Sequence, residues 1–382
     1  DIHPLAVIVS RATYLLALGD LLRFRRRDIR IPVYMANSIR LPEARGVVDI
    51  LGPNGKPVST YIVQADGTEL YIPTSVARIP EASDAAIDYV TEAAKGISSG
   101  DDVPLETFRN TLTRRMEVAA EEGAVQVLHR TAANLAKLIK ERRDTLWSFY
   151  LKNFHKPVFL SQSKSDVAVG NPPWISYRYI LNTDYQAYLK DEMKAHGLFP
   201  KGHLVTHMEM ATLFMVKAAD LYLRQYGQIG FVMPRSIFSA DQHDAFRQGK
   251  FFEITALADL TGVSPLFNVP ASVVFGRKTG TTSFPLKGYS VAGSLPGKNL
   301  TFRDAQNHLS FQDEGYNIYR IGERSFWGTS GEAAKVSEGR SYYYDSFRQG
   351  ATIVPRVFYF VEPRTDPVLG LQIVKGMRYD GE

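Results

Sequence analysis

Hydrophobic positions in the first 40 residues follow first the spacing of a helix and then that of a strand. Apolar side chains between Val7 and Leu22 recur every three or four residues, which predicts a helix that begins at Pro4. The uncharged run of residues 31–35 predicts a short buried strand that ends at Ala36-Asn37-Ser38. A helix followed by a strand is typical of a parallel α/β sheet.

This pattern is interrupted between residues 41 and 154. Three short apolar runs read as strands and are separated by two hairpin signals, Pro53-Asn54-Gly55 and Asp66-Gly67. From about residue 82 the composition becomes rich in Ala, Glu, Arg and Leu, which favours helices. We therefore expect residues 41–154 to be an insertion made of a small β-meander followed by helices.

The α/β pattern resumes after the insertion and weakens beyond Gly280. The predicted elements are a strand at 166–169, a long helix at 205–226, a strand at 229–233, a helix at 241–250 and strands at 254–260 and 271–275. The remaining chain is rich in Gly, Ser, Tyr and Phe. We expect it to form a separate β-rich or irregular module.

Composition limits the classes of protein to which the chain can belong. Its 382 residues, 45% of them hydrophobic, are enough for two or three domains with buried cores. The absence of cysteine excludes disulfides, zinc–thiolate sites and thiol catalysis, and it fits a reducing compartment. A net charge of +5 is compatible with a polyanionic partner. No apolar run looks long enough to cross a bilayer and the N-terminus is unlike a signal peptide. We therefore expect a cytoplasmic protein with no membrane partner. We also expect no bound metal.

The chemistry is concentrated in Asn171-Pro172-Pro173-Trp174, directly after a predicted buried strand. Ligands bind at the carboxyl ends of strands in open α/β sheets. The Asn171 side-chain oxygen and the Pro172 carbonyl can accept both hydrogens of one exocyclic amino group, and Trp174 offers a flat face to a planar base. Such acceptors stabilise the positive charge that develops when an aromatic amine is methylated, so the attack needs no general base. The alternative is a turn followed by a core Trp.

This motif and its setting resemble the adenine-specific (N6) DNA methyltransferases of restriction-modification and phage-defence systems. The resemblance covers residues 1–40 and 155–290, and the tail more loosely. It implies a Rossmann-like methyltransferase sheet, S-adenosylmethionine as the methyl donor, and the start of a target-recognition domain in residues 291–382. It also implies that Asn171 and Pro172 hold the target amino group of a flipped-out adenine, with Pro173 stiffening the loop and Trp174 stacking on the base.

The same resemblance assigns further residues. Asp1 would bind the ribose hydroxyls of the donor and Ile2 would pack on its adenine, although an Asp before a Pro is also a common helix cap. Asn37, followed by Ser38, stands where the family usually has an Asp that accepts from the donor's adenine N6. The Asn37 oxygen can accept that bond without charge, and Asn is also ordinary turn chemistry. Phe267 would close on the second face of the target base, or be a core or hairpin-tip residue.

Two arginines and one missing motif complete the expectations. Arg348 and Arg356 fall where the recognition domain would begin and could contact DNA phosphates or base edges, or lie in a solvated basic loop. The family's Gly-rich donor motif would precede Asp1, and no segment of the chain substitutes for it. The resemblance therefore predicts a truncated or processed form that binds S-adenosylmethionine weakly.

Three functions fit the sequence. The first is N6-adenine methylation of a specific site in double-stranded DNA, with a restriction or specificity subunit or a fused nuclease as a further partner. The second is methylation of glutamine amides in proteins, whose enzymes share the Asn-Pro-Pro-aromatic loop. The long insertion and the basic tail favour the bulkier DNA substrate. The third is a non-catalytic DNA-recognition subunit.

Overall fold

The computed structural model divides the chain into two compact units, Asp1–Ser330 and Gly331–Glu382. It describes residues 2–26, 29, 31–143, 146–200, 207–297, 300–322, 324–334, 361–366, 370 and 372–376. Helix α12 (Ser330–Ala334) begins at the boundary between the units. In the second unit the antiparallel pair β11 (Val361–Thr365) and β12 (Gln372–Gly376) is described.

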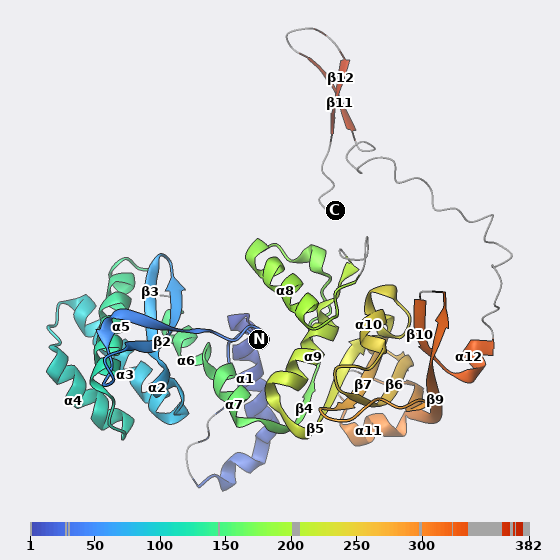
Figure 1. The fold of residues 1–382 in the computed structure, drawn as a ribbon, viewed down its shortest axis with the longest axis horizontal. Helices are drawn as coiled ribbons and strands as arrows, with labels where there is room; N and C mark the ends of the chain where they lie inside the picture. Colours follow the sequence, from blue (N-terminus) through green and yellow to red (C-terminus); the bar gives the residue numbers. More distant parts are fainter. Residues whose placement is uncertain are drawn as a thin grey trace. The chain divides into compact units, whose positions relative to one another are not determined.

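A seven-stranded mixed sheet organises the first unit (Figure 1). The strand order is β10-β9-β8-β6-β7-β5-β4. The strands are β4 (Ser165–Gly170), β5 (Leu223–Pro234), β6 (Glu253–Ser264), β7 (Ala271–Arg277), β8 (Leu286–Ser294), β9 (Leu309–Ile321) and β10 (Arg324–Gly328). Strands β4 and β5 are parallel, as are β6 and β8, whereas β7 runs antiparallel to β5 and β6. The fold class is therefore mixed α/β with one large sheet.

Helices pack on this sheet around one hydrophobic core. The helical elements of this half are η2 (Tyr177–Tyr179), α8 (Thr183–Ala195), α9 (Met210–Tyr222), η4 (Arg235–Phe238), η5 (Asp241–His243), α10 (Asp244–Arg247) and α11 (Phe302–Asn307). The core contains Met215 of α9, Met233 of β5 and Trp327 of β10, so it extends from the β4 side of the sheet to its far edge. A Cβ at Gly227 would lie 3.1 Å from the carbonyl oxygen of Asp166, which is tighter than most side-chain contacts, so the close approach of β4 and β5 favours glycine there.

Strand β4 lies at the edge of the sheet and is exposed. The side chains of Val167 and Val169 are 56% and 79% exposed, so the expectation of a buried strand before the Asn171 motif was wrong. No described strand pairs with the outer side of β4. An apolar edge of this kind is able to pair with another strand.

The insertion forms its own sheet and helices between the first helix and β4. Its strands are β1 (Ala44–Leu51), β2 (Pro57–Ala65) and β3 (Thr68–Pro73), joined at the two predicted hairpins. Its helices are α2 (Thr74–Ala77), α3 (Pro80–Ser99), α4 (Leu105–Met116), α5 (Glu122–Lys140) and α6 (Trp147–Asn153). Helix α7 (Lys156–Ser163) follows the insertion and leads to β4. Three separate apolar clusters, centred on Leu135, Phe108 and Val127, hold these elements together.

The first helix begins at Pro4 as predicted, and most of its apolar side chains are exposed. Helix α1 (Pro4–Leu18) continues into the 3-10 helix η1 (Gly19–Phe24). The combined run is long and apolar enough to cross a membrane by length and composition, so the expectation that no such run exists was wrong. Arg11 in this run donates to the carbonyl of Val33 and lies over the ring of Phe149, which attaches one face of α1 to the protein.

Three further expectations differ from the structure. Residues 31–35 form no strand, because none of them pairs with a described strand. The Val33 N–H instead donates to the carbonyl of Ile31 at 2.8 Å. The long helix ends at Tyr222, and the following residues begin β5. The expected start of a recognition module at residue 291 falls inside β8, and the sheet continues to Gly328.

Candidate functional site

The loop formed by residues 171–174 begins where β4 ends at Gly170. Asn171 is exposed, Pro172 is buried, and Pro173 and Trp174 are half-buried. The Asn171 amide makes no hydrogen bond to another described residue, so its oxygen is free to accept. The two prolines fix the φ angles of the loop and remove two backbone donors from it.

Trp174 and Phe267 lie against each other. The Trp174 indole N–H donates to the carbonyl of Val232 in β5 at 3.2 Å, which fixes the plane of the ring. Its ring centroid is 5.2 Å from that of Phe267, and the planes are tilted by 58°. Phe267 stands in the connection between β6 and β7 and is 45% exposed. The structure thus brings together two aromatic residues that are 93 positions apart in the sequence.

A short stretch of extended pairing holds the chain immediately after Trp174. Met210 N–H donates to Ile175 O at 3.1 Å, and Tyr177 N–H donates to Met208 O at 2.8 Å. Ser176 and Glu209 form the isolated bridge between these two bonds. The start of α9 therefore fixes the direction in which the 171–174 loop leaves the sheet.

Glu209 joins this pairing to the segment after β5. Its carboxylate accepts hydrogen bonds from Ser236 Oγ at 3.2 Å, Gln242 Nε2 at 3.2 Å and His243 Nε2 at 3.1 Å. Burial would raise the pKa of the Glu209 carboxyl, but these hydrogen bonds, with His243 foremost, outweigh it and lower that pKa. We call Glu209 and its three partners the Glu209 cluster.

Arg235 makes the corresponding connection on the Phe267 side. Its backbone N–H donates to the carbonyl of Pro270 at 2.8 Å, three residues from Phe267. Its guanidinium donates to Asp259 in β6 at 2.6 Å and lies 3.9 Å from the centroid of the Phe238 ring. The segment after β5 therefore supports both the 171–174 loop and the connection that carries Phe267.

The residues assigned to the donor lie elsewhere in the same unit. The Asn37 side-chain oxygen accepts from the backbone N–H groups of Ile39 and Arg40 at 3.1 and 3.0 Å. Its amide nitrogen donates to the Tyr185 hydroxyl at 3.1 Å. Asn37 thus closes a local turn, and the oxygen expected to accept from the donor is already engaged. Its assignment to the donor stays a prediction, as does that of Ser38, whose carbonyl accepts from the Tyr222 hydroxyl.

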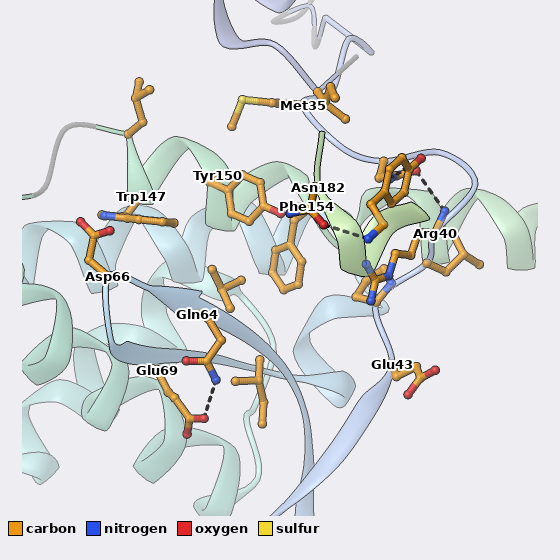
Figure 2. Close-up of a pocket in the computed structure, with 18 of the residues that line it drawn as sticks. Met35, Arg40, Glu43, Gln64, Asp66, Glu69, Trp147, Tyr150, Phe154 and Asn182 are labelled. Carbon is orange, nitrogen blue, oxygen red and sulfur yellow. Dashed lines mark hydrogen bonds between the residues drawn. The ribbon is translucent and has the colours of Figure 1, made fainter. Parts of the chain in front are cut away.

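Ile2 and Asn37 both line a cavity of about 1130 Å³ (Figure 2). Ile2 is 71% exposed. Asp1, Arg348 and Arg356 lie outside the described residues. Among the residues that the structure does describe, no group of three or more His, Asp or Glu side chains could hold a metal ion.

The Glu209 cluster and Arg235 were not singled out by the sequence. Glu209 stands directly before α9, where an acidic residue is ordinary helix-cap chemistry. Its partners Ser236, Gln242 and His243 lie 27 to 34 residues further along the chain. No local pattern carries that information.

Comparison with known proteins places the chain in a family. The model of the Eco57I restriction-modification methylase family matches residues 1–266. The chain belongs to this family. The resemblance to restriction-modification methyltransferases is therefore confirmed, and DNA methylation is the class of reaction that the match supports. No curated protein matches the chain.

Solved structures give distant similarities to this Eco57I-family chain. A modification subunit of a putative type I restriction enzyme from Vibrio vulnificus YJ016 is 11% identical, with 71% of this chain and 62% of that chain covered and a TM-score of 0.30. The DrdV–DNA complex is 14% identical, with 57% and 22% covered and a TM-score of 0.29. The type ISP enzyme LlaBIII bound to DNA is 14% identical, with 63% and 21% covered and a TM-score of 0.30. The chain thus spans about a fifth of the length of DrdV and LlaBIII, and these scores carry no argument about function.

Proposed function

We propose that this protein transfers a methyl group from S-adenosylmethionine to the N6 amino group of a flipped-out adenine in a specific site of double-stranded DNA. The observation that carries the proposal is the 171–174 loop. It places the Asn171 amide, which has no hydrogen-bond partner among the described residues, at the end of a strand beside a Trp174 ring that packs against Phe267. Membership of a restriction-modification methylase family supports DNA as the substrate.

The residues of this loop would act on the target nitrogen by accepting hydrogen bonds. The N6 lone pair of adenine is delocalised into the ring, so the nitrogen is a poor nucleophile. The Asn171 oxygen and the Pro172 carbonyl would accept its two hydrogens, bias it towards sp³ geometry and stabilise the positive charge that develops on it. The donor, when bound, supplies an electrophilic methyl group. The surplus proton leaves the methylated nitrogen after transfer, so no side chain has to remove it beforehand.

Trp174 and Phe267 would hold the flipped base from its two faces. Two rings that sandwich a base have to stand about 7 Å apart, which is twice the ~3.5 Å contact distance between carbon atoms. Their centroids are 5.2 Å apart, so Phe267 has to withdraw by about 2 Å to admit the base. Its place in an exposed connection suits this movement, whereas the bond from Trp174 to Val232 keeps Trp174 in place. Stacking would offset part of the few kcal/mol that flipping costs.

The cavity beside Ile2 and Asn37 fits the donor in size and chemistry. Small-molecule sites commonly measure about 300–1000 Å³, and this cavity of about 1130 Å³ is lined by aromatic, apolar and charged side chains. Ile2 would pack on the adenine of the donor. We also propose Arg348 and Arg356 as DNA contacts, and a restriction or specificity subunit or a fused nuclease as a partner.

The test is methylation of plasmid DNA by the protein expressed from its own gene. We expect N6-methyladenine at one sequence motif, read by modification-sensitive sequencing. Asn171→Ala should lower the rate by about 10²–10³-fold, the loss typical of one preorganised hydrogen-bonding group. Asn110→Ala, which truncates an exposed Asn on α4, is the matched control and should be neutral.

Two results would overturn the proposal. Full methylation by Asn171→Ala would remove the loop from the mechanism. Absence of DNA methylation together with methylated glutamine in a peptide substrate, detected by mass spectrometry, would establish the amide-methylating alternative.

A further inference from the structure

The cavity that contains Ile2 and Asn37 has a second wall, contributed by the insertion (Figure 2). One wall of the cavity is lined by residues of α8 such as Tyr185. On the other side it is lined by Trp147, Tyr150 and Phe154 at the end of the insertion. The insertion therefore borders the same space as Ile2 and Asn37, two of the three described residues assigned to the donor.

The insertion wall is a preformed aromatic surface. Tyr150 and Phe154 are stacked, with ring centroids 5.7 Å apart and planes at 13°. Trp147 stands edge-on to Tyr150 with centroids 6.2 Å apart. These rings lie above Gln64 and Asp66 of the β2–β3 hairpin in Figure 2. A planar heterocycle could therefore stack here without rearrangement of the helix.

Two polar groups of this wall have no protein partner in the described part of the chain. They are the Tyr150 hydroxyl and the Trp147 indole N–H, and both can donate to a ligand. Burial raises the pKa of the Tyr150 hydroxyl, so it remains protonated and able to donate at neutral pH.

The charges around the cavity are balanced. Three arginines (Arg40, Arg45 and Arg143) face three carboxylates (Glu43, Asp66 and Glu69) among its lining residues. Arg143 and Asp66 are 3.7 Å apart. A polyanion such as a DNA strand would need an excess of positive charge here. A ligand that joins an aromatic base to groups of both charges suits this lining better.

Arg11 fixes α6 relative to the segment before Asn37. It donates to Asn153 of α6 at 3.4 Å and to the carbonyl of Val33 at 3.0 Å, four residues before Asn37. Its guanidinium also lies 4.9 Å from the centroid of the Phe149 ring. Arg11 thus links α6 to the segment that leads to Asn37.

We propose that the insertion forms the second wall of the methyl-donor pocket, with Trp147 and Tyr150 in contact with the adenosyl part of S-adenosylmethionine. The inference rests on the proposed function, because that function supplies the donor. It gives the insertion a role in binding the cofactor, separate from any contact with DNA.

The experiment measures binding of S-adenosylhomocysteine, the unreactive product, by isothermal titration calorimetry with the protein expressed from its own gene. We expect Trp147→Ala and Tyr150→Ala each to raise the Kd at least tenfold, and Tyr150→Phe to raise it by a smaller factor because the ring remains. Lys152→Ala is the matched control. It truncates a half-buried side chain of the same helix that does not line the cavity, and it should leave the Kd unchanged.

The outcomes separate this inference from the proposed function. Unchanged Kd values in both alanine variants, with DNA methylation intact, would overturn the inference alone. An equal increase in Lys152→Ala would also overturn it, because the effect would then come from loosening α6. A wild-type protein that neither binds S-adenosylhomocysteine nor methylates DNA would overturn the proposed function itself. Thermal unfolding midpoints identify any variant that fails to fold, and Tyr150→Phe then provides the decisive comparison.

Discussion

At the scale of single residues, the sequence predicted the position of the 171–174 loop after a strand but not the hydrogen bonds of Asn37. The 171–174 loop is a local motif, so its residue types and its position after a strand can both be recognised in the sequence. Asn37 was harder because its oxygen is taken by the N–H groups of Ile39 and Arg40, and this depends on the turn geometry. Glu209 could not be found because its partners come from a distant segment.

The Glu209 cluster leads to a prediction about positioning. Glu209→Gln keeps the shape of the side chain but replaces a charge-assisted acceptor of three donors with a neutral amide. We expect kcat for DNA methylation to fall about tenfold or more, because misplacement of the 171–174 loop by a fraction of an ångström weakens the bonds to the target nitrogen. DNA affinity, measured by fluorescence anisotropy, should change little.

The control for this variant is Glu106→Gln on the exposed surface of α4, which should leave both quantities unchanged. The pH dependence gives a second readout. Because the pKa of Glu209 is lowered in the folded protein, its stabilising effect is present above the ordinary carboxyl pKa and is lost as the pH falls through the lowered value. If the free energy of unfolding declined identically towards acid pH in wild type and Glu209→Gln, this role would be contradicted.

At the scale of elements, hairpin signals and helical composition predicted the insertion well. The two turns between β1, β2 and β3 are where Pro53-Asn54-Gly55 and Asp66-Gly67 indicated. The apolar run of residues 31–35 was misread as a strand, since a continuous apolar run shows burial but not hydrogen-bonded pairing. The strands beyond Gly280 were missed because their pairing partners, such as β6 for β8, lie in other parts of the chain.

The surroundings of Gly123 in α5 and of Gly96 in α3 predict different effects of replacing each glycine by alanine. A Cβ at Gly123 would lie 2.5 Å from a Val58 methyl and 2.9 Å from the Leu51 carbonyl oxygen. Gly123→Ala should therefore destabilise the protein by about 1–3 kcal/mol, as overpacking does. At Gly96 in α3 the nearest atom is the end of the Asp101 side chain, which can move. Gly96→Ala should thus be neutral or stabilising by up to about 1 kcal/mol.

Chemical denaturation followed by circular dichroism measures both glycine variants. The difference in stability between the two variants measures how closely α5 packs on the β1–β2 pair. If Gly123→Ala were as stable as Gly96→Ala, α5 would not press on the β1–β2 pair as closely as the structure has it.

At the scale of the whole molecule, the arrangement of the insertion and the sheet could be predicted from the sequence only in part. The chain leaves the α/β part near residue 41 and returns to it at β4, and the sequence shows this as a break in the α/β pattern. The extent of the sheet was not, because β9 and β10 lengthen it with residues whose periodicity is weak. Apolar periodicity shows which face of an element is buried, but not which other element buries it.

The junction between the insertion and α7 contains a buried histidine that predicts how stability depends on pH. His155 Nε2 is 3.0 Å from Ser83 Oγ of α3, and neither residue is exposed. Burial, together with the positive charge of neighbouring Lys156, lowers the pKa of His155 from 6.5 to about 4. The unfolded chain therefore binds a proton between these pH values that the folded chain does not.

The stability contributed by neutral His155 is fully present above pH 6.5 and is lost as the pH falls from 6.5 towards 4. The shift corresponds to about 3 kcal/mol across that window. His155→Gln retains hydrogen-bonding groups but cannot titrate there. We expect its free energy of unfolding to gain about 3 kcal/mol on wild type between pH 7 and pH 4. Comparison with wild type cancels the carboxyl groups that both proteins share, and His308→Gln at an exposed site should follow wild type. Parallel pH profiles for wild type and His155→Gln would show that His155 is protonated in the fold, and that the contact between α3 and the start of α7 is more open to water than its burial indicates.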